Sequence, residues 1–121
     1  MAVTVEASGT QAASIGTEHT LGAALTGAKV YILHVNTKNM VLGDTLELRA
    51  YKKVLTGDAN GALVYSATYA HVQGDAAAPG SSAAGEVVKA SIPIASAYSL
   101  TFTLKQTAGT GRSFDWNQVS I

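Results

Sequence analysis

The sequence contains no cysteine, and this absence excludes disulfide bonds and thiolate metal sites. It says nothing about the redox compartment, because a chain without cysteine suits an oxidising or a reducing one. A chain of 121 residues is expected to form one domain that buries about 65% of its unfolded surface. Such a domain folds without disulfide or metal support.

Charged residues are scarce. They make up 13% of the chain, and the formal net charge is +0, whereas roughly 25% of residues are charged in an ordinary globular domain. Because affinity for a phosphate backbone comes from several Lys and Arg contacts, we expect no direct nucleic-acid binding. Net charge also keeps proteins apart in solution, so a chain without net charge is suited to forming part of an assembly.

Long apolar runs are missing too. No stretch approaches the roughly 20 apolar residues that a membrane-spanning helix needs. The first basic residue is Lys29, so the basic start that marks a secretory signal is not seen. We therefore expect synthesis in the cytoplasm and no membrane partner.

The pattern that the sequence does contain is alternation of apolar and polar residues, the signature of β-strands. Residues 44–55 and 63–72 alternate on either side of a turn at 57–61, and this predicts a hairpin. A second hairpin is predicted over 99–121, with its turn at 108–112. Seven or eight short strands at spacings near ten residues predict an all-β, antiparallel β-sandwich of the jelly-roll or immunoglobulin-like type.

Three other segments complete this prediction. The stretch 29–36 has apolar residues on both faces, which is typical of a central strand covered on two sides. Residues 86–94 are expected to form a strand that ends near Pro93. The stretch 73–85, rich in Ala, Gly and Ser, is expected to be a mobile loop.

The chain is expected to divide into a loose N-terminal arm, residues 1–16, and a β-sandwich domain, residues 17–121. Large apolar residues are sparse before residue 28. Ile15, Leu21 and Leu25 are the expected anchors of that region.

No set of residues predicts catalysis, a cofactor or a metal. His19, His34 and His71 lie in separate segments, without the short paired spacing of zinc ligands. The acidic residues are scattered singly, and those that follow a glycine, such as Asp44, are typical of turns. The stretch 109–113 lacks the Gly-Lys-Ser/Thr ending of a phosphate-binding loop and joins two predicted strands. We expect a protein that is not an enzyme.

Three tyrosines, Tyr51, Tyr65 and Tyr69, lie near a small basic cluster in the first hairpin. Exposed together, they would offer a stacking surface for a sugar or a single-stranded nucleic acid. The alternative is that they are cross-strand pairs that stabilise the sheet. We favour the second interpretation because the basic cluster is small.

Three segments carry a family resemblance: DTLELRAYKKV at 44–54, VYSATYA at 64–70 and FTLKQTAGTGRSFDW at 102–116. With their surroundings, from about residue 17 to 121, they resemble small virion structural proteins of tailed bacteriophages. The size and the predicted sandwich are similar to capsid decoration, or cement, proteins. The resemblance implies a homotrimer on the capsid surface, bound to the shell of major capsid protein and to its own copies. It also implies an N-terminal arm that reaches a neighbour, where Val3 and Val5 would add a strand.

The expected function is therefore a non-enzymatic virion protein that stabilises the phage head. Two alternatives stay open. One is a carbohydrate-binding sandwich of a tail or fibre, which would use Tyr51, Tyr65 and Tyr69. The other is a head-completion or tail component.

Overall fold

A computed structural model describes residues 2–70 and 88–121 of the chain, and these residues form nine β-strands. None of the described residues belongs to a helix long and apolar enough to cross a membrane. The strands are β1 (Thr4–Ala12), β2 (Glu18–Thr20), β3 (Lys29–Asn36), β4 (Thr45–Lys52), β5 (Ala62–Ala70), β6 (Val88–Ala90), β7 (Ile94–Ser96), β8 (Leu100–Ala108) and β9 (Ser113–Ser120).

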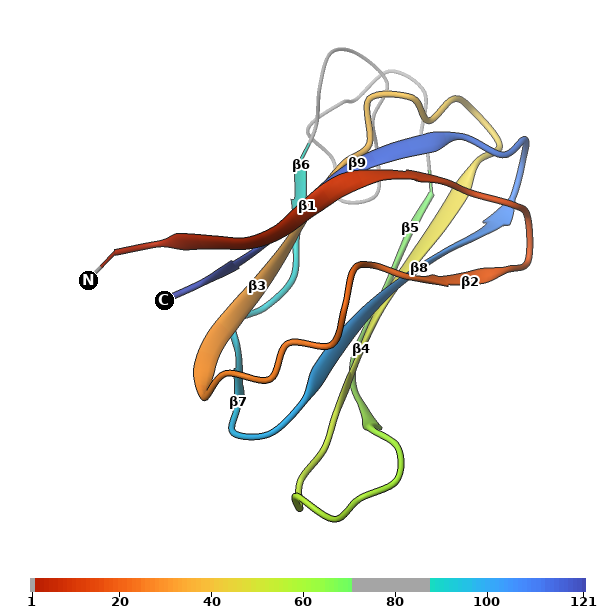
Figure 1. Cartoon of the computed structure of the whole chain (residues 1–121). Coiled ribbons are helices and arrows are strands. Elements are labelled where there is room, and N and C mark those ends of the chain that lie inside the picture. Colours follow the sequence, from red (N-terminus) through yellow and green to blue (C-terminus); the bar gives the residue numbers. More distant parts are fainter. Residues whose placement is uncertain (1, 71–87) are drawn as a thin grey trace.

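The strands form two antiparallel sheets that face each other (Figure 1). Sheet A has the order β1-β9-β3-β6, and β7 also pairs with β3. Sheet B has the order β2-β8-β4-β5. The prediction of an all-β antiparallel sandwich is confirmed.

The strand order distinguishes between the two predicted topologies. Strands β6 and β7 pair with opposite ends of β3, so they act as one interrupted strand and each sheet has four positions. The β8–β9 hairpin then lies between β1–β2 and β3–β4, because β9 pairs with β1 and β3 while β8 pairs with β2 and β4. This is the rolled ribbon of a jelly roll. An immunoglobulin domain would divide seven strands into four and three.

The core lies between the sheets and follows the predicted alternation. In β4, Leu46, Leu48 and Ala50 are fully buried, while their sequence neighbours on the other face are partly exposed. Burying one leucine or phenylalanine contributes about 1.5–3 kcal/mol, so this interior dominates the stability. The remaining large members are Leu21, Leu25, Tyr31, Leu33, Val35, Met40, Ile94, Leu100, Phe102, Leu104 and Phe114.

Asp44 joins the β3–β4 connection to the β8–β9 turn. Its carboxylate is 1% exposed and accepts hydrogen bonds from Val41 N at 2.9 Å, Arg112 Nε at 2.8 Å and Thr110 N at 3.2 Å. Burial alone would raise the pKa of Asp44, but these bonds outweigh it and the pKa is lowered. Gly109 has φ +91°, and a Cβ there would collide with the carboxylate. The predicted turn thus depends on a glycine next to a buried anion.

The expected loose arm is wrong for residues 4–12. They form β1, which pairs with β9 along its whole length, from Thr4 opposite Ser120 to Ala12 opposite Ser113. The sequence alternates only weakly there because the strand is held by its backbone rather than by large side chains. Ile15 is 44% exposed and does not anchor this region, whereas Leu21 and Leu25 are buried as expected.

Two further predictions need correction. The second face of β3 is not fully covered, since Val30 and Ile32 remain partly exposed. The strand expected over 86–94 is broken near Pro93, where the chain leaves β6 and begins β7. The loop expected over 73–85 and His71 lie outside the described residues.

Candidate interaction surfaces

The outer face of sheet A is apolar at one end. Val5 of β1, Val119 of β9 and Ile32 of β3 stand opposite one another in a row across three strands. Val30 and Ile121 form the next row, where Ile121 N donates a hydrogen bond to Val30 O at 2.9 Å. Val5 is 59% and Ile121 is 41% exposed. Val30 and Ile32 are partly exposed, and Val119, between Val5 and Ile32, is buried, with 5% of its surface exposed. We call these five residues the sheet A apolar face, and a contiguous apolar patch that reaches the surface can mark an interaction site.

The other end of the same face is polar. His34 Nδ1 lies 3.0 Å from Asn117 Oδ1, and Thr10 Oγ1 donates to Asp115 Oδ1 at 2.7 Å. Lys38 Nζ is 3.2 Å from the other oxygen of Asp115. The bonds from Thr10 and Lys38 lower the pKa of Asp115. The sheet A apolar face therefore lies at the end of the molecule where both termini lie (Figure 1).

Strand β1 forms one edge of sheet A. Among the described residues it pairs with β9 alone. Its sequence, TVEASGTQA, holds neither lysine nor proline, two residues that commonly protect an edge strand from pairing with another chain. The edge is interrupted only by a bulge between Val5 and Ala7. Its unpaired backbone can therefore accept a strand from a partner.

Glu6, at that bulge, fixes the start of β1. Its Oε1 accepts hydrogen bonds from Lys29 Nζ at 2.8 Å and from Ser120 Oγ at 2.5 Å. The bond from Lys29, followed by that from Ser120, lowers the pKa of Glu6. These contacts tie β1 to β3 and β9 and hold Val5 beside Val119. Val3, just before the strand, is 66% exposed.

The three tyrosines of the sequence analysis do not form one platform. Tyr65 lies opposite Ala50 and Tyr69 opposite Leu46, so both face the core side of sheet B. Their hydroxyls are 3.4 Å apart, and Lys89 Nζ lies 5.5 Å from the centre of the Tyr69 ring. Burial, together with the Tyr69 hydroxyl, raises the pKa of Tyr65. Tyr51 lies on the opposite, outer face, beside Arg49 and Glu18.

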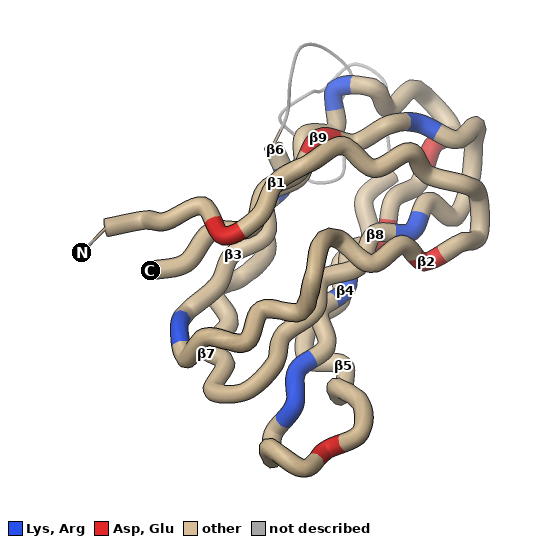
Figure 2. The backbone as a smooth tube through the Cα atoms, viewed as in Figure 1, with Lys and Arg blue, Asp and Glu red and all other residues tan. Residues whose placement is uncertain are grey.

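The outer face of sheet B is polar. Glu18 Oε2 accepts hydrogen bonds from Tyr51 OH at 2.7 Å and from Thr103 Oγ1 at 2.6 Å. Arg49 Nε lies 2.8 Å from Glu47 Oε1, and its Nη1 lies 3.9 Å from Glu18 Oε1. Burial alone would raise the pKa of Glu18, but the bonds from Thr103 and Tyr51 and the nearby cations lower it. Figure 2 shows that charged residues are few and scattered along the rest of the chain.

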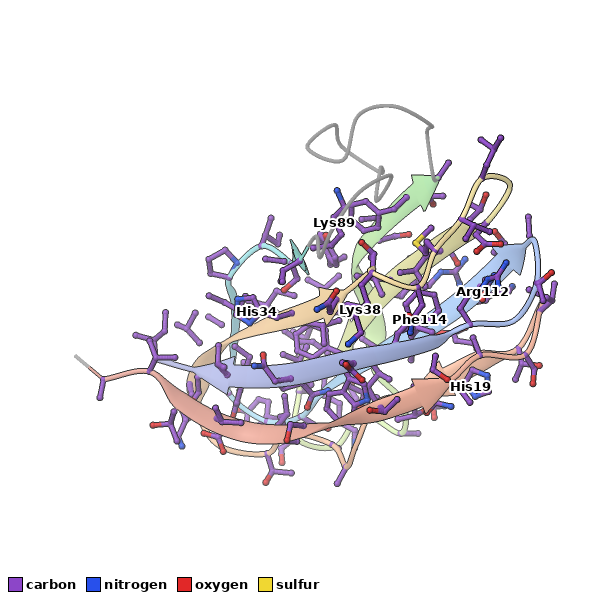
Figure 3. The ribbon with its side chains drawn as sticks, turned by 90° about the horizontal axis from the view of Figure 1, so that it is seen from above. His19, His34, Lys38, Lys89, Arg112 and Phe114 are labelled. Carbon is purple, nitrogen blue, oxygen red and sulfur yellow. The ribbon has the colours of Figure 1, made fainter. Side chains whose placement is uncertain are left out.

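The described residues contain no group of three or more His, Asp or Glu side chains that could hold a metal ion. His19 and His34 lie well apart in Figure 3. His19 Nε2 accepts a hydrogen bond from Ser14 N at 3.2 Å, and His34 contacts Asn117. Each of these two histidines thus has a local structural partner.

Sequence reasoning identified Val3 and Val5 but missed Val30, Ile32, Val119 and Ile121 as their neighbours. The apolar second face of residues 29–36 pointed to these neighbours, but the sequence analysis interpreted it as a face covered by other parts of the same chain. The cluster around Glu18 was also missed, because it gathers residues from three strands far apart in the sequence. A search with this chain matched no protein-family model, no curated protein and no solved structure.

Proposed function

We propose that this chain is a structural protein of a tailed-phage virion, a capsid decoration protein that packs against copies of itself and against the shell. The observation that carries the proposal is the sheet A apolar face next to the open β1 edge. An apolar surface beside an edge strand offers side-chain burial and backbone hydrogen bonds to the same partner. That the assembly is a phage virion is inferred from the segments that resemble small virion proteins of tailed bacteriophages.

A second exposed apolar group extends the surface that the proposed assembly would bury. The β4–β5 connection presents Val54 and Leu55, and the adjoining start of β5 presents Leu63. These side chains are 67%, 65% and 54% exposed. A hollow of about 590 Å³ lined by Val30, Val54 and Ile121 joins this group to the sheet A apolar face, so the two form one extended surface. The three-fold symmetry of the proposed assembly is what the resemblance to decoration proteins implies.

Neutral charge fits the same role. Copies with a formal net charge of +0 do not repel one another at close range, so little apolar area is needed to hold them together. A jelly roll is also a fold that viral capsid proteins use, although the fold alone does not define a function. The tyrosine platform of the carbohydrate-binding alternative is not formed, because Tyr51 and the pair Tyr65 and Tyr69 face opposite sides.

The test mixes the purified chain with shells of the major capsid protein of its own genome and follows both through a density gradient. The wild type should travel with the shells. Val5→Asp should lower occupancy at least tenfold, since a buried valine is worth about 1.5–3 kcal/mol. Thr68→Asp, the same charge introduced at another exposed strand position, on β5, is the matched control and should bind as the wild type does.

Failure of the wild type to travel with the shells would overturn the proposal. Occupancy by a ring of six or twelve copies would instead assign the chain to a head-completion or tail structure.

A further inference from the structure

The outer face of sheet B carries a polar hollow that the proposed function does not use. Its volume is about 430 Å³, and its lining comes from β2, β4, β8 and the β4–β5 connection. Pockets for small ligands occupy roughly 300–1,000 Å³. The hollow lies on the outer face of sheet B, opposite the sheet A apolar face, and Asn60 and Gly61 of the β4–β5 connection form part of its rim. The lining residues are Glu18, Thr20, Tyr51, Asn60, Gly61, Thr101 and Thr103.

One of the lining side chains is a fixed carboxylate, that of Glu18. Oε2 of Glu18 is held by the hydroxyls of Tyr51 and Thr103, at 2.7 and 2.6 Å. The other oxygen, Oε1, is 3.9 Å from Arg49 Nη1, beyond hydrogen-bond distance, and accepts no hydrogen bond from the described residues. Glu18 therefore presents one acceptor with its orientation already set.

Asn60 is brought to the same place by the glycine that follows it. A Cβ on Gly61 would lie 3.0 Å from the backbone of Tyr51 and Lys52, so a side chain there would push the loop away. Without one, the loop lies against β4 and the exposed Asn60 side chain borders the hollow. Its amide both donates and accepts hydrogen bonds.

We propose that this hollow binds a neutral pyranose sugar. A carboxylate oxygen and an amide that line the same hollow match the donor and acceptor capacity of sugar hydroxyls. The tyrosine ring beside them offers an apolar surface for the C–H face of the ring. The charges around the hollow balance, because Glu18 and Glu47 both lie opposite Lys105 across the strands and Arg49 forms ion pairs with both carboxylates. This balance favours an uncharged ligand over an anion or a cation.

The test is a titration of isotope-labelled protein with the methyl glycosides of glucose, galactose, mannose and N-acetylglucosamine, followed by backbone amide shifts. At least one sugar should give saturable shifts centred on Glu18, Tyr51 and Asn60. Because the hollow is shallow and offers few bonds, the Kd should be on the order of 1 mM. Asn60→Ala should weaken binding about fivefold, the equivalent of about 1 kcal/mol for a lost hydrogen bond.

Two controls separate the hollow from the rest of the surface. Thr68→Ala removes a polar side chain from the outer face of sheet B outside the hollow, and Tyr98→Ala removes an exposed tyrosine elsewhere. Both should keep the wild-type Kd. The proposal is overturned if no sugar gives saturable shifts, if the shifts centre elsewhere, or if Asn60→Ala binds as its controls do. These outcomes concern sugar binding, and Val5→Asp on the opposite sheet tests shell binding separately.

Discussion

Single buried polar residues hold the connections of this jelly roll. Gln106, fully buried, donates from Nε2 to the carbonyls of Ala108 and Thr110 and accepts from Arg112 N, so it shapes the β8–β9 turn from inside. Asp44 fixes the same turn from the β3–β4 side. The sequence predicted a turn at both places from glycine and Asx residues. It did not predict that one carboxylate joins the two, because the contact spans 68 residues.

Replacing Asp44 with alanine should lower the free energy of unfolding by about 3 kcal/mol, since it removes charged hydrogen bonds and leaves buried donors unpaired. Urea denaturation measures this change. Asp58→Ala is the matched control: Asp58 also accepts two backbone hydrogen bonds, from Val54 and Leu55, but in an exposed loop. It should cost about 1 kcal/mol. Equal losses of unfolding free energy in the two variants would contradict the role of Asp44 in joining the β3–β4 connection to the β8–β9 turn.

Stability should depend on pH through the same group. The folded pKa of Asp44 lies below its ordinary value of 3.8, so its contribution is complete above that value and is lost as the pH falls toward the folded pKa. The free energy of unfolding should therefore be level between about pH 7 and 5 and fall below about pH 4. Asp44→Asn should flatten part of this fall, and an unchanged slope would show that other carboxylates account for it.

Among the strands, the pairings between neighbours in the sequence were predicted, and those between distant strands were not. The β4–β5 and β8–β9 hairpins were predicted because alternation and turn residues are local signals. The position of β1 was not, since its partner β9 lies about a hundred residues away and its own side chains are small. Tyr51 and Tyr65 face opposite sides because Tyr65 pairs with Ala50, the neighbour of Tyr51 in β4, and this register between two strands is not a local signal.

The β1 edge makes a paired prediction. Successive residues of an edge strand point their amides alternately to the neighbouring strand and to the open edge. Of Thr10→Pro and Gln11→Pro, the one that loses a bond to β9 should cost about 3 kcal/mol, and the other less than about 1 kcal/mol. Hydrogen exchange of the wild type identifies in advance which amide is protected.

The tolerated proline variant also tests the use of the edge. It removes a donor that only a partner strand would need, so it should bind shells less tightly than the wild type while staying folded. Unchanged shell binding would exclude the β1 edge from the interface and leave the sheet A apolar face alone in that role.

On the scale of the whole molecule, the two outer faces differ in chemistry. Sheet A carries Val5, Ile32 and Ile121 at one end, whereas sheet B carries hydroxyls and balanced charges. Alternation predicted the sandwich but not this difference, because the outer residues of each strand acquire neighbours only when the strand order is known. We propose separate partners for the two faces, a protein for sheet A and a small polar ligand for sheet B.

The most direct test of a self-associating virion protein is the mass of the chain alone, measured by sedimentation equilibrium over a range of concentrations. We predict a trimer, three times the 12.4 kDa chain, which Val5→Asp converts to monomer and Thr68→Asp leaves intact. A mass of 12.4 kDa at every concentration, with the same value for both variants, would contradict the account.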